Sequence, residues 1–310
     1  MKGRITGRTP GLRYPKLDAT AIHGKLGAHP QREATMTTLL HRRLRPLVAL
    51  APILVAVLAA PVQADEAPLV TDRPTAGISS TTVGQWRVVL EFGGDVDSAK
   101  TGDVRTLSWR TPAKLRFGVL DRLELHLETP GFAADAMHGG PLNDTASYGF
   151  GGLGFGFKAH LVEGGYWKGG GPSLGLMTTL ITPLGTAGFD DVAWVPRVVL
   201  AAEWGLPQAF GLGINLGAEA PRADKGARYL QGMWSIALAR SWAPLTERVA
   251  TFVEFFGDLA FSSPANNGLS VDAGFTFLLT PNVQVDIALR SGILGTDHEI
   301  GGGLGMAFRL

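Results

Sequence analysis

The chain has 310 residues, 45% of them apolar, and it contains no cysteine, which excludes a disulfide framework and thiolate metal sites. Its formal charge of +1 is misleading, because residues 1–64 hold 10 of the 28 Lys and Arg residues but only 2 of the 27 Asp and Glu residues. The remainder has 18 basic and 25 acidic residues, a net charge of −7, so the sequence gives no chain-wide argument for nucleic-acid binding and we expect no nucleic-acid partner.

The first predicted element is a secretory signal peptide at 36–64. Its apolar run follows three arginines within 42–45, and small residues precede a cleavage site after Ala64. Prolines interrupt the run, which is too short for a membrane-spanning helix. Residues 1–35 show no periodicity, and we interpret them as an upstream extension that is not part of the mature protein, with translation starting at Met36.

Residues 65–83 are polar, rich in turn-forming residues and free of alternation, which predicts an N-terminal periplasmic or lumenal segment ahead of the first strand. This segment contains Asp72 and Arg73. Two interpretations stay open: the pair is buried in the mouth of a barrel, or the segment is a solvated tail.

Twelve segments then alternate apolar and polar residues with a period of two, the pattern of strands with one apolar face. The clearest is a hairpin over 106–129, with Leu115 and Leu125 on the apolar face and Arg116 and Glu124 on the other. The predicted strands are 85–92, 106–117, 123–129, 148–161, 172–182, 193–204, 210–220, 229–240, 251–261, 269–279, 283–289 and 301–310.

The even number of strands predicts an all-β fold, a closed antiparallel transmembrane β-barrel of about 12 strands over 84–310. Closure leaves no unpaired strand edge in lipid. Links after the second, sixth and tenth strands are short, whereas those after the first and third, 93–105 and 129–145, are predicted as long polar loops. Tryptophans near strand ends predict a partial interfacial girdle.

The predicted location is the outer membrane, with outer-membrane lipid and lipopolysaccharide as partners. The last segment, 301–310, resembles the C-terminal assembly signal of outer-membrane proteins, which predicts the barrel assembly machinery as a further partner.

The polar residues, which occupy every second position of each strand, are expected to line the lumen. Such a lumen filters small solutes by charge and size. The lumen-lining or solute-binding candidates are Arg87, Glu91, Arg110, Lys114, Arg116, Glu124, His126, Glu128, Arg197 and Glu203. We therefore predict a channel or transporter for small solutes. The alternative is that these side chains pair with one another in a closed structural barrel, since a polar lumen is required by both.

Three further alternatives have less support. A lipid hydrolase on a barrel needs a nucleophile with a histidine base, but no Gly-x-Ser-x-Gly motif occurs and no catalytic residue is predicted. Glu124, His126 and Glu128 have metal-ligand chemistry, yet their spacing is that of any inward row, so no metal or cofactor is predicted. A soluble lipid-binding barrel is the remaining rival.

Two short motifs resemble a known family. They are Thr71-Asp72-Arg73-Pro74 and 117–125, with the sequence FGVLDRLEL at the first short turn. Both look like motifs of the outer-membrane transporter family named for the MetA pathway of phenol degradation. The resemblance implies an outer-membrane barrel of a Gram-negative bacterium that passes small, aromatic or hydrophobic, solutes.

Overall fold

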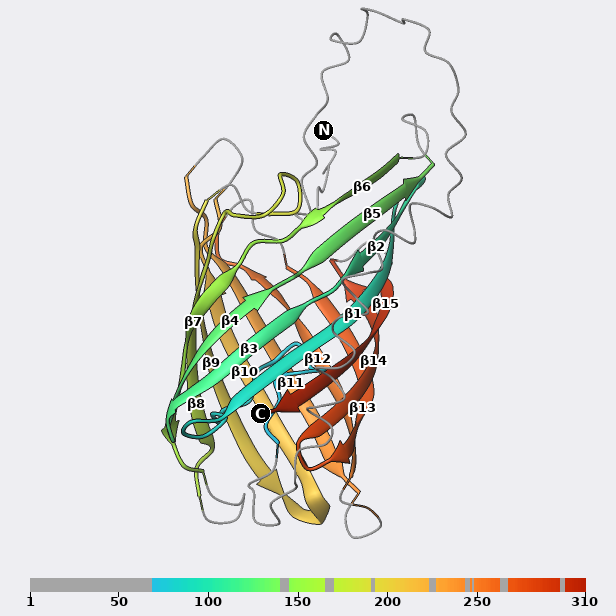
Figure 1. Ribbon diagram of the computed structural model, residues 1–310. Helices are drawn as coiled ribbons and strands as arrows, with labels where there is room; N and C mark the ends of the chain where they lie inside the picture. The colour runs from blue at the N-terminus through green and yellow to red at the C-terminus, as the bar shows by residue number, and fades with distance from the viewer. Residues whose placement is uncertain are drawn as a thin grey trace, which may run out of the picture. The chain divides into compact units, whose positions relative to one another are not determined.

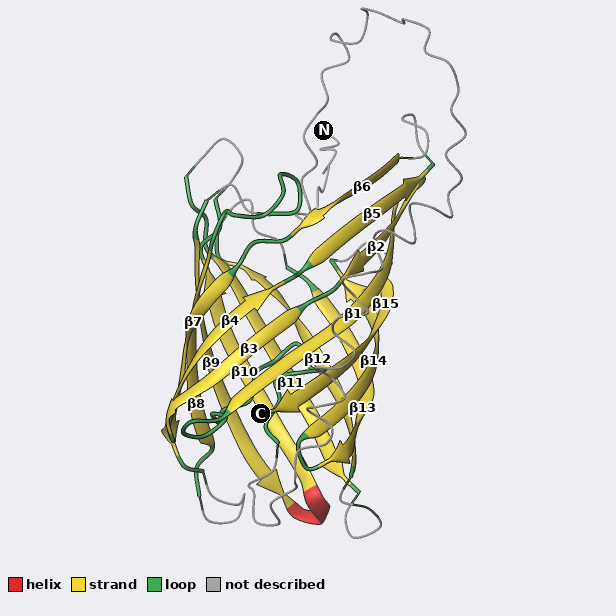
Figure 2. Ribbon diagram, viewed as in Figure 1, coloured by secondary structure: helices red, strands yellow, loops and turns green. Residues whose placement is uncertain are grey.

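The computed structural model describes residues 69–139, 145–164, 170–190, 193–222, 227–242, 246, 248–262, 267–295 and 299–310. The predicted extension, signal peptide and start of the N-terminal segment lie outside these ranges. Within them, no helix has the length and apolar character needed to cross a membrane. The single 3-10 helix of the described residues, η1 (Pro207–Ala209), joins two strands at the end of the barrel that carries the short turns (Figure 2).

The described strands form one antiparallel sheet that closes on itself (Figure 1). They are β1 (Val88–Thr101), β2 (Val104–Arg110), β3 (Ala113–Leu120), β4 (Leu123–Thr129), β5 (Phe132–His138), β6 (Thr145–Phe150), β7 (Gly154–Val162), β8 (Ser173–Ile181), β9 (Val195–Leu206), β10 (Phe210–Glu219), β11 (Gln231–Ser241), β12 (Val249–Ala260), β13 (Leu269–Thr280), β14 (Val283–Leu294) and β15 (Ile300–Arg309). The last strand pairs with the first, from Val89 opposite Arg309 to Ser98 opposite Ile300, and this seam closes the barrel.

Three of the barrel's strands are interrupted, which confirms the predicted number of twelve. β2 and β3 are two parts of one strand broken before Ala113 by Pro112; β4 and β5 are separated by Pro130-Gly131, and β6 and β7 by 151–153. Proline cannot donate to a strand ladder, so it marks such breaks. Beyond the breaks, β2, β5 and β6 continue the sheet from the second half of β1 (Figure 1).

Two predicted long loops are wrong. The stretch 93–105 is the second half of β1 and a tight turn at Gly102, where φ is +61°, and 129–145 contains β5. In β5 alanines occupy three positions on both faces, so the apolar and polar residues do not alternate and the pattern has no period of two. Pro130-Gly131 also has the composition of a turn, although here it only bends the strand.

Apolar side chains cover the outside of the barrel and ionic ones fill its inside. Trp109, Leu216 and Phe275 are about half exposed, whereas Arg116, Lys158 and Glu254 are fully buried. A water-soluble protein shows the opposite distribution. The outer surface is therefore suited to hydrocarbon and the inner one to polar contacts, as in outer-membrane barrels.

Adjacent residues of β13 test this assignment. Phe275→Arg places a cation on the outer face and is expected to destabilise the barrel by about 2–4 kcal/mol if the site lies at the bilayer midplane. Thr276→Arg, one residue further and on the lumen face, is the matched control and is expected to cost less. Urea unfolding in lipid vesicles measures both, and equal losses would contradict the assignment.

Candidate functional site: an occupied lumen

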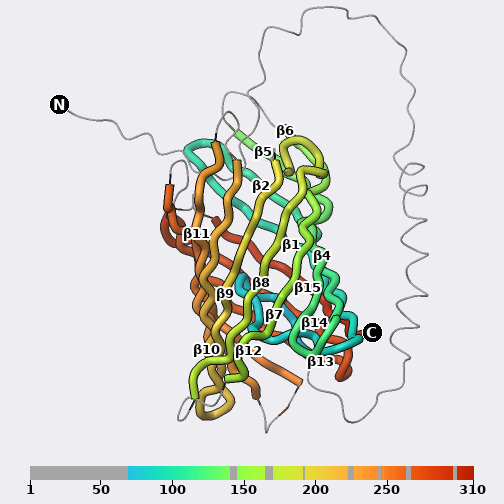
Figure 3. The backbone as a smooth tube through the Cα atoms, turned by 90° about the vertical axis from the view of Figure 1, so that its left-hand side faces the viewer, coloured from blue at the N-terminus to red at the C-terminus, as the bar shows by residue number. Residues whose placement is uncertain are grey.

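The N-terminal segment lies inside the barrel, as its blue trace shows in Figures 1 and 3. We call residues 69–83 the plug. Five wall side chains accept hydrogen bonds from its backbone N–H groups. These are Glu91 (from Asp72 and Arg73), Glu254 (from Ala76 and Gly77), Asn215 (from Ile78), Glu203 (from Ser80) and Glu124 (from Val83). The acceptors come from β1, β12, β10, β9 and β4, so the plug is held from several sides.

The plug forms no strand, and its buried N–H groups therefore need acceptors from elsewhere. The carboxylate of Glu254 lies 2.6 Å from the nitrogen of Ala76 and 3.0 Å from that of Gly77. Glu203 accepts from the nitrogen of Ser80 at 2.8 Å and also from its hydroxyl group. Hydrogen bonds to charged acceptors contribute roughly 1.5–3 kcal/mol each. The lumenal carboxylates thus anchor the plug.

Asp72 of the plug binds a cluster of cations on one wall. Its carboxylate lies 2.7 Å from the Nζ atoms of both Lys114 and Lys158 and 3.7 Å from a guanidinium nitrogen of Arg116. Burial alone raises the pKa of Asp72, but the attraction of the three cations outweighs it and holds that pKa well below the usual value. The carboxylate is therefore ionised at neutral pH, and its contribution is lost only when the pH falls through the lowered pKa.

Arg116 is the centre of this cluster. Its fully buried guanidinium group donates to Glu124 at 2.7 Å and to Glu91 at 3.0 Å, and it also binds the carbonyl oxygen of Val70. Glu91 and Glu124 in turn accept from the plug backbone. One buried arginine therefore orients two of the carboxylates that hold the plug.

Arg73, the next residue, reaches acidic side chains on other strands. Its Nη2 atom lies 3.4 Å from Asp286 of β14 and 3.6 Å from Asp95 of β1, and it also donates to the carbonyl oxygen of Leu304. Asp72 therefore contacts cations of the wall, and its neighbour Arg73 contacts carboxylates of other strands.

The plug joins β1 through a sharp bend that packs on the turn between β3 and β4. Gly84 has a φ of +84°, and the nitrogen of Trp86 donates to the carbonyl oxygen of Gly118 at 2.8 Å. A Cβ atom at Gly118 would collide with the carbonyl group of Gly84, so this position requires glycine. Asp121 accepts from Thr82 and Gln85. The two sequence motifs thus serve the same structure. The motif at 71–74 lies in the plug, and the motif at 117–125 forms the turn on which the bend after the plug packs.

The ten predicted lumen residues all lie on the inside of the barrel or at its end. Glu91, Lys114, Arg116, Glu124 and Glu203 contact the plug directly. Of the others, Arg110 pairs with Asp135, Arg197 with Glu219 and Glu128, and His126 with Thr179, while Arg87 lies in the bend. Binding of solute by any of them stays a prediction.

The sequence places Lys158 and Glu254 on the lumen-facing side of their strands, but neither they nor Asn215 are among the ten candidates, although each holds the plug. The inward face of β12 is hard to predict from the sequence, because Phe252 shares this face with Glu254 and also points inward, with 7% of its surface exposed. A signal was present in Lys158 and Glu254: each lies on the inward parity of its strand. The alternation does not predict that these side chains contact the plug.

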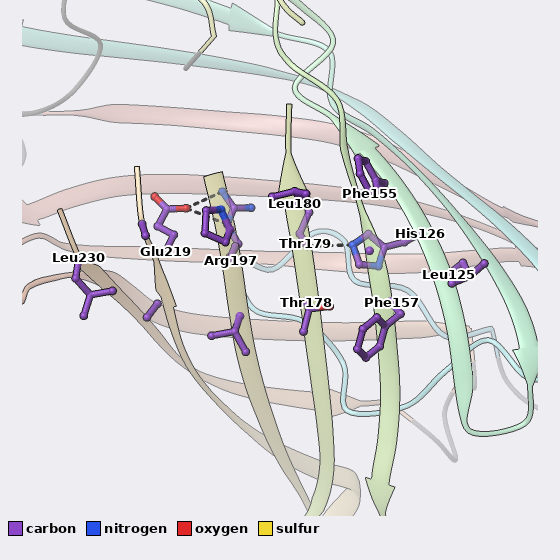
Figure 4. A pocket seen from close by; sticks show the side chains of 15 residues that line it. Leu125, His126, Phe155, Phe157, Thr178, Thr179, Leu180, Arg197, Glu219 and Leu230 are labelled. Carbon is purple, nitrogen blue, oxygen red and sulfur yellow. Dashed lines mark hydrogen bonds and ion pairs between the residues drawn. The ribbon is translucent and has the colours of Figure 1, made fainter. Parts of the chain in front are cut away.

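A hollow of about 870 Å³ lies in the wall over β4 and β7–β10 (Figure 4). Its apolar lining includes Leu125, Phe155 and Phe157, which are 50%, 45% and 40% exposed. These side chains belong to the lipid-facing surface, whereas His126 and Arg197, also in the lining, belong to the lumen side of the wall. The hollow therefore faces hydrocarbon and is separate from the occupied lumen.

A closed twelve-stranded barrel with an apolar exterior and a charged interior is an outer-membrane β-barrel. Residues 71–310 match the model of the family described as "Putative MetA-pathway of phenol degradation", and the chain belongs to that family. The predicted resemblance is thereby confirmed.

Solved structures of outer-membrane barrels are similar to this chain, and the first of those that follow shares its fold. The COG4313 outer membrane channel from Pseudomonas putida F1 is 12% identical, with a TM-score of 0.59, and the match covers 76% of this chain and 100% of that one. The NanC porin is 11% identical, with a TM-score of 0.47 and coverage of 71% and 100%. The transport unit of the autotransporter AIDA-I from Escherichia coli is 14% identical, with a TM-score of 0.46 and coverage of 71% and 89%. Among curated proteins, none matches this sequence.

Proposed function

We propose that this protein is a gated outer-membrane channel for small solutes, and that the plug is the gate. The observation that carries the proposal is a charged lumen filled by a separate segment of the chain. That segment is bound through side chain–backbone hydrogen bonds and ion pairs, which exchange with solvent without unfolding a strand. A purely structural barrel needs no such removable filling. The family description, which refers to phenol degradation, makes small aromatic solutes the first to test.

The short turns support a periplasmic position for the proposed gate. Outer-membrane barrels have short periplasmic turns and longer extracellular loops. The bend that carries the plug packs on the β3–β4 turn, which is one of the short ones. The plug therefore closes the periplasmic half of the lumen and opens toward the periplasm.

A reversible disulfide tests the gate. The hydroxyl oxygens of Ser80 in the plug and Ser173 in β8 lie 2.9 Å apart, so the Ser80→Cys/Ser173→Cys pair needs only a small shift to form a bond of about 2.0 Å. The chain has no other cysteine. Oxidation is expected to abolish solute flux into proteoliposomes, and reduction to restore it, as measured by swelling and single-channel recording.

The single variants Ser80→Cys and Ser173→Cys are the controls, and neither is expected to respond to oxidation. Flux that is the same before and after reduction would show that solutes pass beside a fixed plug. No flux in either state, or in the unmodified protein, would indicate a closed structural barrel instead of a channel.

A further inference from the structure

Lys114 and Lys158 depend on the plug for their hydrogen-bonded carboxylate. Each Nζ atom lies 2.7 Å from an oxygen of Asp72. The next carboxylates are beyond hydrogen-bond distance, Glu128 at 3.7 Å from Lys114 and Glu124 at 3.8 Å from Lys158. When the plug leaves, these ammonium groups therefore lose the anion that binds both of them.

The wall itself does not replace that anion. Glu91 and Glu124 both accept hydrogen bonds from Arg116 at 3.0 Å or less, which holds their carboxylates beside the guanidinium group and outside hydrogen-bond distance of Lys158 and Lys114. Lys158 is fully buried, and losing its hydrogen-bonded carboxylate leaves its ammonium group with only the more distant Glu124 at 3.8 Å, which is unfavourable. Removal of Asp72 thus leaves a preformed pair of lysines, supported by a nearby guanidinium group, with one vacant carboxylate position.

Other ion pairs of the lumen differ in this respect. Arg110 with Asp135 and Arg197 with Glu219 join one strand to its neighbour, and they need no part of the plug. Among the described residues, the site around Asp72 is where wall cations converge on an anion carried by the removable segment.

We infer that Lys114, Lys158 and Arg116 form a binding site for the carboxylate of a small organic acid, and that Asp72 occupies this site in place of the solute. The inference rests on the proposed channel function, because it names the solute class that the same lumen takes. An entering carboxylate replaces Asp72 on the two lysines and so weakens the hold of the plug. The sulfur of Met177 lies 3.5 Å from the Nζ atom of Lys114 and gives the site an apolar side suited to a carbon skeleton or ring.

Calorimetric titration of the detergent-purified full-length protein with benzoate tests the inference. Asp72→Ala is expected to bind benzoate on the order of tenfold more tightly than the unmodified protein, because the solute no longer competes with an internal carboxylate. Benzamide, which has the same shape without charge, is expected to show no such gain. Asp72→Ala/Lys158→Met is expected to lose it.

Arg73→Ala is the matched control, since it releases the neighbouring plug residue from Asp286 and Asp95 but keeps the carboxylate of Asp72. Its benzoate affinity is expected to rise much less than that of Asp72→Ala, because the plug is held less firmly but its carboxylate still competes for the lysines. An equal gain in Arg73→Ala, an equal gain for benzamide, or no gain in Asp72→Ala would each overturn the inference.

A second measurement keeps Asp72 in place, in case Asp72→Ala fails to fold. Ser80→Cys replaces a fully buried plug residue, and benzoate, but not benzamide, is expected to accelerate its labelling by a maleimide. Failure of this effect would contradict displacement of the plug by carboxylates. Flux of uncharged solutes, measured on the same samples, tests the channel function separately. A protein that conducts these solutes but does not respond to benzoate would contradict only the carboxylate site and not the channel function.

Discussion

The Glu203→Gln/Glu254→Gln variant is expected to spend much more time open than the unmodified protein. Both glutamates accept from the plug backbone through charged oxygens, and neither forms an ion pair among the described contacts. A neutral amide oxygen keeps the shape but weakens the bonds by about 1 kcal/mol per position. A total of about 2 kcal/mol shifts the ratio of docked to released plug by roughly thirtyfold.

Single-channel recording measures this shift as open probability. Glu219→Gln is the matched control, because Glu219 pairs with Arg197 of the adjacent strand and has no described contact with the plug. It is expected to leave the open probability unchanged. An equal increase in the control would mean that lumenal charge in general, and not the anchoring of the plug, determines the open state.

Arg116→Met is expected to destabilise the barrel strongly. The change leaves Glu91 and Glu124 buried without their cation, and breaking a buried ion pair in this way typically costs about 3–5 kcal/mol. Lysine at this position lacks the planar group that binds both carboxylates, so Arg116→Lys is expected to recover only part of the loss.

Urea unfolding in vesicles and heat-modifiable migration measure the effect. Arg110→Met is the control, because it strands one carboxylate, the buried Asp135, where Arg116→Met strands two, and it is expected to cost less. The double change Arg116→Met/Glu124→Gln should regain stability by removing one stranded charge. If Arg116→Met unfolds at the same urea concentration as the unmodified protein, the cluster does not stabilise the barrel as described.

The strands that face hydrocarbon could be predicted from the sequence because lipid enforces the alternation. The hairpin of β3 and β4 is of this kind, with Leu115 and Leu125 outside and Arg116 and Glu124 inside. Prediction failed for the second half of β1 and for β5, which continue the sheet beyond the breaks at Pro112 and Pro130. There the residues do not separate by face, so the pattern carries no signal.

The inward position of the candidate site residues could be predicted from parity, but their partners could not. The alternation along the strands predicts that Glu203 and Glu254 face the lumen, but it does not predict which groups they contact there. Their partner is a segment without periodicity, whose backbone N–H groups are present in every sequence. Within this segment, only the charged pair Asp72 and Arg73 suggested burial in the barrel. From the sequence alone, a solvated tail was an equal alternative.

The bend at Gly84 fixes how an expelled plug behaves, because it ties that segment to the barrel wall through β1. A ligand on a short tether experiences an effective concentration in the millimolar range. In the proposed gating, a released plug therefore returns by itself once its competitor has passed, without any energy source in the outer membrane. It also follows that a solute present at trace levels cannot hold the pore open by mass action, and that opening is brief unless supply is abundant.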